Sequence, residues 1–208
     1  MAINSKTVNI SDSDICDLLK KKYKKSIISV SVKPDLTITI EPAIIVDCIK
    51  YLKESRLLQF HTFIDICGVD YPNKPNRFTI VYHLLSMTKN KRIRVKLSIQ
   101  ESDSVESLVS IFPSADWFER EAYDMYGIKF ANHPDLRRML TDYNFQGHPL
   151  RKDFPLTGYT QVRYDETQKR VVHEQVELGQ EFRDFDCESP WLGEVLEKNN
   201  NDISEDDG

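Results

Sequence analysis

The chain has 208 residues, of which 40% are hydrophobic and 29% charged, and its formal net charge is −5. This balance is typical of a globular protein of one or two domains and excludes a chain that is disordered throughout. No apolar run approaches the roughly 20 residues that a membrane-spanning helix needs, so any membrane association is expected to be peripheral. Residues 164–208 hold 14 acidic and 4 basic side chains, which argues against a general nucleic-acid binder.

The first part of the chain shows a helix, a hairpin and a second helix. Ser11 stands before an acidic first turn and predicts a helix start. Two runs of alternating polar and apolar residues flank Pro34 and Asp35, which predicts a β-hairpin with one buried face. Pro42 suits the first turn of the second helix. In that helix Cys48 lies on the apolar stripe, so it is expected to be a small core residue.

Three more strands follow in the middle of the chain. They are predicted at residues 60–68, 78–85 and 92–99. In the last strand Arg92, Arg94 and Lys96 alternate with apolar residues. We therefore expect one face of this strand to be buried and the other to be cationic and wet. His83 falls within a predicted strand and is expected to be a hydrogen-bonded structural residue.

Two helices close the regular part of the sequence. A short helix is predicted at residues 105–112, and a longer one begins at the cap Ser114 and ends at Gly127, a natural C-terminal cap. Together the elements predict an α+β fold with a mostly antiparallel sheet packed with helices, which we assign to residues 1–127.

The periodicity is lost after Gly127. Residues 128–190 are rich in proline and aromatic side chains. A structureless loop of this length is improbable inside a compact domain, and its aromatic content is too high for a solvated linker. We therefore expect a long extended C-terminal arm at 128–190 that buries its aromatic side chains on another protein. Residues 191–208 are expected to form a disordered acidic tail.

The sequence lacks the usual signs of a nucleotide or metal site. It has no glycine-rich phosphate loop, and its four cysteines form no C-x-x-C pair. Two catalytic alternatives stay open: Glu121 with Asp124 as an acid–base pair, and His133 with His148 as a metal site. An ion-paired helix surface is the simpler interpretation of the first, and no ligand spacing supports the second. Local chemistry alone therefore predicts no catalytic, cofactor-binding or metal residue.

One long segment has a specific resemblance. EREAYDMYGIKFANHPDLRRML, at residues 119–140, is similar to the signature of the small hydrophilic core subunit of respiratory complex I. This 30 kDa subunit occurs in bacterial complexes and is called subunit 9 in mitochondrial genomes. Residues 141–172 resemble the C-terminal arm of the same family, and DICGVDYP and IFPSADWFERE also match upstream. The signature positions that fit are Glu119, Arg120, Glu121, Asp124, Met125, Tyr126, His133, Arg137, Met139 and Leu140.

The resemblance implies a structural and assembly subunit in the peripheral arm of proton-translocating NADH:ubiquinone oxidoreductase. Such a subunit holds no redox cofactor and clamps the large subunit of the quinone site, near the subunit with the terminal iron–sulfur cluster. NADH, FMN, iron–sulfur clusters and ubiquinone are then expected on other subunits. The residues expected in the signature or the partner interface are Glu119, Arg120, Glu121, Asp124, His133, Arg137, Arg138, Arg151 and Lys152.

The resemblance also implies a location on the matrix side of the mitochondrial inner membrane, or on the cytoplasmic side of a bacterial membrane. The first ten residues resemble neither a secretory signal nor a transit peptide, which suits a chain made inside the organelle or in a bacterium. Two other functions stay open. One is a free-standing soluble enzyme that uses the acid pair or the histidine pair; the other is a subunit of a related membrane-bound hydrogenase or plastid-type complex.

Overall fold

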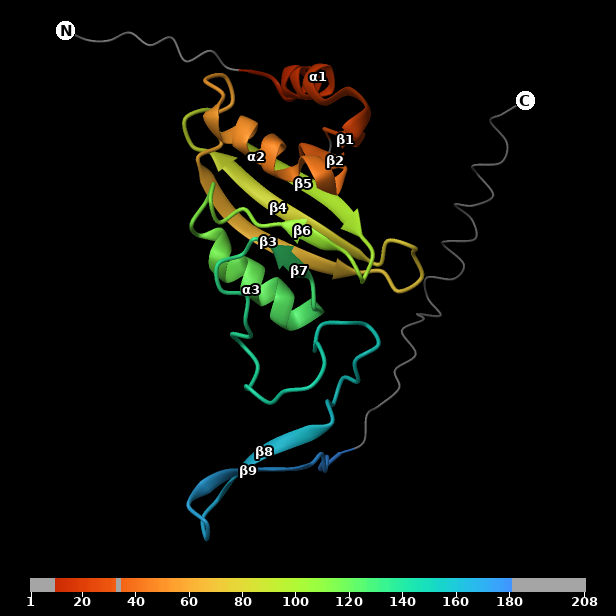
Figure 1. Cartoon of the computed structure of the whole chain (residues 1–208), viewed down its shortest axis with the longest axis vertical. Helices are drawn as coiled ribbons and strands as arrows, with labels where there is room; N and C mark the ends of the chain where they lie inside the picture. The colour runs from red at the N-terminus through yellow and green to blue at the C-terminus, as the bar shows by residue number, and fades with distance from the viewer. Residues whose placement is uncertain (1–9, 33–34, 181–208) are drawn as a thin grey trace, which may run out of the picture. The chain divides into compact units, whose positions relative to one another are not determined.

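The computed structural model describes residues 10–32 and 35–180 (Figure 1). The chain divides into two units, one that runs to Gly158 and one that begins at Tyr159. Within the described residues, the first unit contains a five-stranded sheet and a two-stranded sheet, and the second contains a two-stranded hairpin.

The five-stranded sheet has the strand order β1-β2-β5-β4-β3. Its strands are β1 (Ile27–Ser31), β2 (Thr37–Ile40), β3 (Thr62–Asp70), β4 (Phe78–Ser86) and β5 (Lys91–Ile99). Neighbouring strands are antiparallel except for β2 and β5, which run parallel. The predicted α+β class with a mostly antiparallel sheet is therefore confirmed. The centre of the first predicted turn falls at residues 33–34, outside the described residues.

Local sequence explains the two N-terminal helices. α1 (Asp12–Tyr23) begins with a capping box, in which Ser11 and Asp14 bond each other's backbone N–H groups; a 3₁₀ turn, η1 (Lys24–Ser26), follows. α2 (Ile45–Glu54) is preceded by the 3₁₀ turn η2 (Pro42–Ile44), as proline at a helix start favours. Cys48 is fully buried on its apolar stripe, as predicted.

The sheet buries one face in a single core. Along β5 the apolar residues Ile93, Val95, Leu97 and Ile99 are buried, whereas Arg92 is exposed and Arg94, Lys96 and Ser98 are half-buried. The predicted division of this strand into a buried and a wet face is confirmed. The same alternation in β4 places Phe78, Ile80, Tyr82 and Leu84 in the core and turns His83 to the other face.

The predicted helix at residues 105–112 is wrong. Ser104–Glu106 instead form β6, which pairs in parallel with β7 (Lys129–Ala131), and Val105 is opposite Phe130. This pairing joins residues that are distant in sequence, so it overrides the local helical pattern. α3 packs against β3 and contacts β7, whereas β6 lies against the η2 turn (Figure 1).

Helix α3 (Ala115–Tyr126) ends at Gly127, which has the left-handed φ of 76° expected of a C-cap. The expected N-terminal cap is wrong, because Ser114 has helical backbone angles and its side chain makes no capping bond. The N–H groups of Ala115 and Asp116 instead donate to the carbonyls of Phe112 and Pro113 in the preceding turn. These two N–H groups therefore need no side-chain cap.

Residues 128–158 belong to the first unit, to which they contribute β7 and a long loop. In the second unit, β8 (Thr160–Asp165) and β9 (Arg170–Gln175) form an antiparallel hairpin. The division of the chain at residues 127 and 190 stays a prediction, and the expected tail at 191–208 lies outside the described residues. In the part of the chain that the structure describes, no helix is long and apolar enough to cross a membrane.

Two leucines test the core assignment with the same substitution. Leu52 is fully buried on α2, and Leu57, just after that helix, is 46% exposed. Leu52→Ala should lower the free energy of unfolding by about 2–5 kcal/mol, because it removes apolar contacts and leaves a cavity. Leu57→Ala should cost less than about 1 kcal/mol. Urea unfolding of the two variants measures the difference, and equal losses would contradict the assignment.

Candidate functional site

A buried carboxylate on α3 organises the signature segment. The side chain of Asp124 is completely buried. It receives a hydrogen bond of 2.8 Å from Nη1 of Arg138 and one of 2.6 Å from the hydroxyl of Thr141. Three backbone N–H groups complete the shell, those of Met139, Leu140 and Thr141, at 2.7 to 3.0 Å. The loop after α3 is thus wrapped around one negative charge.

These donors decide the ionisation of Asp124. Burial alone would raise the pKa of this carboxyl group, but the hydrogen bonds from the Thr141 hydroxyl and the three backbone N–H groups outweigh burial. The pKa of Asp124 therefore lies well below its usual range, and the group is a permanent anion at neutral pH. A carboxylate with its oxygens occupied in this way is not free to act as a general base for a substrate.

Arg138 and His148 extend the attachment of the loop. Arg138 also donates 2.9 Å to the carbonyl of Gly147. His148 donates through Nδ1 to the backbone carbonyl of Asp124 at 2.9 Å. Burial lowers the pKa of His148, and the nearby charges of Arg151 and Arg138 lower it further, so the imidazole is neutral at pH 7.

The end of the loop is fixed to the sheet and to the end of α3. Arg151 donates through Nε to the carbonyl of Tyr126 at 2.6 Å and forms an ion pair with Glu101. The backbone N–H of Lys152 donates 2.8 Å to Asp70, at the end of β3, and Asp70 is also held by Arg77. Gly127 lies next to the Arg151 side chain. A Cβ atom at this position would lie 2.5 Å from Nη2 of Arg151.

The two basic doublets each have an inward and an outward member. Arg138 and Arg151 point inward, with side chains only 22% and 16% exposed. Arg137 is 61% exposed and paired with Asp135, which is also exposed, and Lys152 is exposed. The structure therefore separates residues that hold the loop from residues available to a partner.

A second buried carboxylate, Glu119, holds the segment before α3. It accepts a hydrogen bond of 2.6 Å from the Ser107 hydroxyl and one of 2.7 Å from the N–H of Leu108. Burial raises the pKa of Glu119 despite these two bonds. The His133 side chain is also fully buried, and its Nε2 lies 3.1 Å from Asp116 and 3.8 Å from Glu119.

The geometry does not favour the two catalytic alternatives. Asp124 is enclosed by its donors, so it forms no open acid–base pair with the half-buried Glu121. His133 and His148 serve separate attachments, to Asp116 and to the Asp124 carbonyl. Among the described residues, the potential metal ligands that do lie close together are Asp65, Cys67 and His83. This group includes neither His133 nor His148.

Large apolar side chains are exposed on the outer side of this segment. Trp117 on α3 is 66% exposed, and Tyr143 in the loop is 93% exposed. Leu140, Leu150 and Leu156 are also exposed. Arg120 reaches across from α3 to the carbonyl of Arg137 at 3.4 Å. Aromatic and arginine side chains of this kind carry much of the binding energy in protein interfaces.

Several residues that hold this site were missed from the sequence. Thr141, Asp70 and Glu101 bond to residues of the α3 segment and its loop but carry no motif. One signal was present for Asp70, since an acidic residue at the end of an apolar strand needs a cationic partner if it is buried. Thr141 gave no such signal, because its role depends on how the loop folds back onto α3.

The fold and site define an α+β protein with a loop fastened to one helix by buried charge. Comparison with known families identifies it further: the model of the respiratory-chain NADH dehydrogenase 30 kDa subunit matches residues 38–160, and the chain belongs to this family. A relative from Maricaulis maris, named as a subunit of NADH-quinone oxidoreductase, is 60% identical over 159 residues, which cover 76% of this chain and 80% of the relative. The equivalent NADH-quinone oxidoreductase subunit of Rhizobium meliloti is 59% identical over the same length, with 76% and 79% covered.

A solved structure shares the fold. It is a chain of the membrane-bound sulfane sulfur reductase, an archaeal respiratory membrane complex. The match has a TM-score of 0.59 and 24% sequence identity, and it covers 69% of this chain and 85% of that one. At this identity the likeness supports the architecture alone.

Asp124→Asn tests the buried charge. The substitution leaves Arg138 with a neutral partner in a buried site, so it should lower the free energy of unfolding by about 3–5 kcal/mol. Asp135→Asn, the same change in an exposed ion pair, should cost less than about 1 kcal/mol. Because the pKa of Asp124 is depressed, its contribution is complete above about pH 4 and is lost as the pH falls further. Urea unfolding at several pH values should show a larger acid-side loss of stability in the wild type than in Asp124→Asn, in which the loss from other carboxylates such as Asp70 remains.

Glu119→Gln should change the pH profile in the opposite sense. A raised pKa means that the folded chain holds this proton more tightly than the unfolded chain, so the contribution of Glu119 to stability falls as the pH rises above about 4.3. The glutamine variant should lack that fall, whereas Glu54→Gln, at an exposed position, should keep it. Unfolding experiments between pH 4 and 7 make the comparison; identical profiles for the two variants would contradict the role of burial.

Proposed function

We propose that this chain is a core structural and assembly subunit in the peripheral arm of the proton-translocating NADH:ubiquinone oxidoreductase. Family membership and the names of the relatives support this proposal. The structural observation that carries the proposal is that charged side chains of this segment hold the chain's own loop in place. Asp124, Arg138 and Arg151 bond within the chain and fix a loop. The loop and α3 then present exposed aromatic and basic side chains outward.

In this proposal the chain clamps the large subunit of the quinone site, next to the subunit that carries the terminal iron–sulfur cluster. Arg137 and Lys152 are the members of the doublets that reach carboxylates of the partner. Trp117 and Tyr143 supply the apolar anchors of the contact. Glu119 and His133 do not contact the partner in this proposal. They support the contact surface indirectly, because they fix the segments on either side of α3.

The contribution to turnover is positional. The chain takes part in NADH:ubiquinone reduction as a component of the complex and supplies no catalytic residue of its own. NADH, FMN, the iron–sulfur clusters and ubiquinone bind to other subunits. The free-standing enzyme is not favoured, because the residues that it would use hold the fold together.

The proposed place of the chain is at the membrane surface, on the side where the peripheral arm projects. The relatives named above are bacterial, which supports the cytoplasmic side of a bacterial membrane. The matrix side of the mitochondrial inner membrane is the equivalent place in an organelle, and the bacterial relatives give it no direct support.

The hairpin of the second unit has an exposed apolar face, which also supports a subunit that contacts neighbours in a complex. Val162, Tyr164 and Val171 lie on one face of β8 and β9 and are 53% to 58% exposed. An isolated two-stranded hairpin is marginally stable in water. Burial of this apolar face by a neighbouring subunit would stabilise it, as expected of an arm over residues 128–190.

The double variant Arg137→Ala/Lys152→Ala tests the proposed contact. Loss of the partners of buried carboxylates should weaken docking by roughly 2–5 kcal/mol, which is more than tenfold in affinity. Native gels of solubilised membranes should show less assembled complex, while NADH:quinone turnover per assembled complex should change little. The stability of the isolated chain should be close to wild type, because both side chains are exposed.

Two controls sharpen this test. Lys50→Ala/Arg56→Ala removes one lysine and one arginine at other exposed positions and should leave the complex at its normal abundance. Arg138→Ala should destabilise the isolated chain itself, because it uncovers Asp124. The proposal fails if Arg137→Ala/Lys152→Ala leaves abundance unchanged, and a collapse of turnover at normal abundance would instead indicate a direct role in catalysis.

A further inference from the structure

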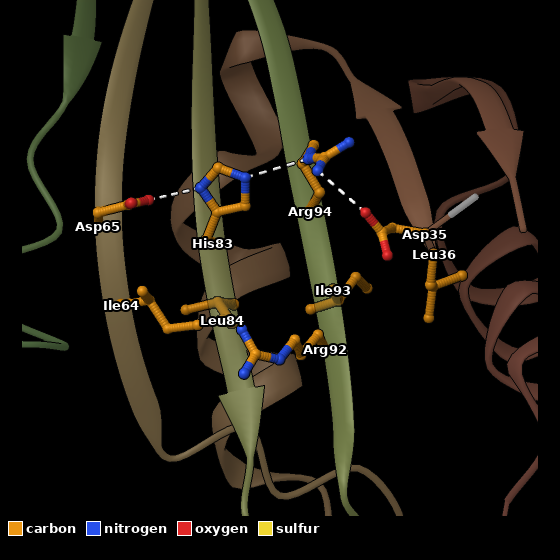
Figure 2. A pocket seen from close by; sticks show the side chains of 9 residues that line it. All are labelled: Asp35, Leu36, Ile64, Asp65, His83, Leu84, Arg92, Ile93 and Arg94. Atoms are coloured by element: carbon orange, nitrogen blue, oxygen red, sulfur yellow. Dashed lines mark hydrogen bonds and ion pairs between the residues drawn. The ribbon is translucent and has the colours of Figure 1, made fainter. Parts of the chain in front are cut away.

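A line of polar side chains crosses the face of the sheet that is turned away from the core (Figure 2). Asp65 on β3, His83 on β4 and Arg94 on β5 are neighbours in register. Nδ1 of His83 contacts Asp65, and Nε of Arg94 donates 3.0 Å to Nε2 of His83. Arg94 then reaches Asp35, before β2, at 3.2 Å. The expected structural role of His83 is thus confirmed.

These contacts fix the state of the histidine. Nε2 accepts a hydrogen bond from Arg94, so the ring proton is on Nδ1 and is donated to Asp65. A divalent cation between Asp65, Cys67 and His83 would have to displace that proton. It would also face the guanidinium of Arg94, at hydrogen-bond distance from the same ring. The three potential ligands lie within 4.8 Å of one another, but their surroundings suit an anion better than a metal ion.

A pocket of about 340 Å³ adjoins this line of side chains. Its lining combines apolar side chains, Leu36 and Ile64 among them, with the charged groups of Asp35, Arg92 and Arg94 (Figure 2). The two aspartates are held by Arg94 and His83. Arg92 is exposed, and among the described residues it has no ion-pair partner. The pocket therefore offers an unused guanidinium beside an apolar floor.

Lys96 extends the same surface. It lies four residues from Arg92 on the same face of β5 and also has no ion-pair partner in the described part of the chain. At a rise of about 3.3 Å per residue, the two cations are roughly 13 Å apart along the strand. An extended polypeptide with two spaced carboxylates can meet both. A nucleic acid backbone fits less well, because Asp35 and Asp65 on the same face would repel its phosphates.

We propose that this outer face of the sheet docks an acidic, partly apolar segment of another subunit of the complex. A carboxylate of that segment pairs with Arg92 and its apolar side chain enters the pocket. This inference rests on the proposed function and adds a second surface to it, on the opposite side of the sheet from the core. Charge complementarity and the apolar floor carry the argument.

Cys67 is a native reporter for this face. Its side chain is exposed on β3, close to Asp65 and His83, whereas Cys16 and Cys48 are buried. In a Cys187→Ser background, N-ethylmaleimide labelling of Cys67 should be at least about tenfold slower in the assembled complex than in the free chain. Mass spectrometry of the Cys67 peptide measures both rates at one pH. Equal rates would overturn the proposal.

A charge-reversal variant provides the second test. Arg92→Glu should lower the abundance of the complex at least about fivefold on native gels, while Arg56→Glu, the same change at an exposed position outside the pocket, should not. Both variants should unfold like the wild-type chain in isolation. Normal abundance of Arg92→Glu together with unprotected Cys67 would refute docking here.

The remaining outcomes are also decisive. Residues 181–208 hold ten acidic and two basic side chains, so they are the competing occupant within the same chain. If Cys67 is protected in the free chain and becomes reactive when these residues are removed, the tail is the occupant and the proposal is overturned. If the chain is absent from the complex altogether, the proposed function fails; if it is present with Cys67 fully reactive, only the docking inference fails.

Discussion

The carboxylate of Asp124 is the contact on which the rest of the signature segment depends. A charge buried this deeply is tolerated only because Arg138, Thr141 and the backbone of residues 139–141 surround it with donors. The same donors belong to a loop that would otherwise lack regular structure. One buried anion therefore gives the loop a defined shape, and the shape decides which side chains point outward. An arrangement of this kind favours a binding surface over a reaction centre.

Much of the fold was predictable because its causes are local. The alternation in β5 and the helix start at Ser11 are patterns within a few residues, and both were predicted from the sequence. The strand at Ser104–Glu106 was missed, because its partner at Lys129–Ala131 lies beyond a helix. Local propensity cannot reveal such a pairing. The parallel contact between β2 and β5 is non-local in the same way.

The sequence predicted many of the residues in the candidate site, but it predicted only part of what each residue does there. Asp124 was a signature position, and Arg138 and Arg151 were among the residues expected in the signature or the partner interface, but the sequence gave no way to separate inward from outward side chains. That separation comes from tertiary geometry, since the inward arginines meet Asp124 and the Tyr126 carbonyl. Their neighbours Arg137 and Lys152 are left in solvent. Adjacent residues with the same charge thus differ in burial and in their contacts within the chain.

The parallel pairing of β2 with β5 has a consequence for the order in which the chain folds. The strands β3, β4 and β5 form an antiparallel meander joined by short connections. Contacts of this local kind form quickly, whereas the closure of a long loop between β2 and β5 is slow. The hairpin of β1 and β2 leaves the ribosome first but finds its place in the sheet only after β5 is made. The first strands synthesised are therefore the last to join, and until they do, β5 has an unpaired edge that can associate with other chains.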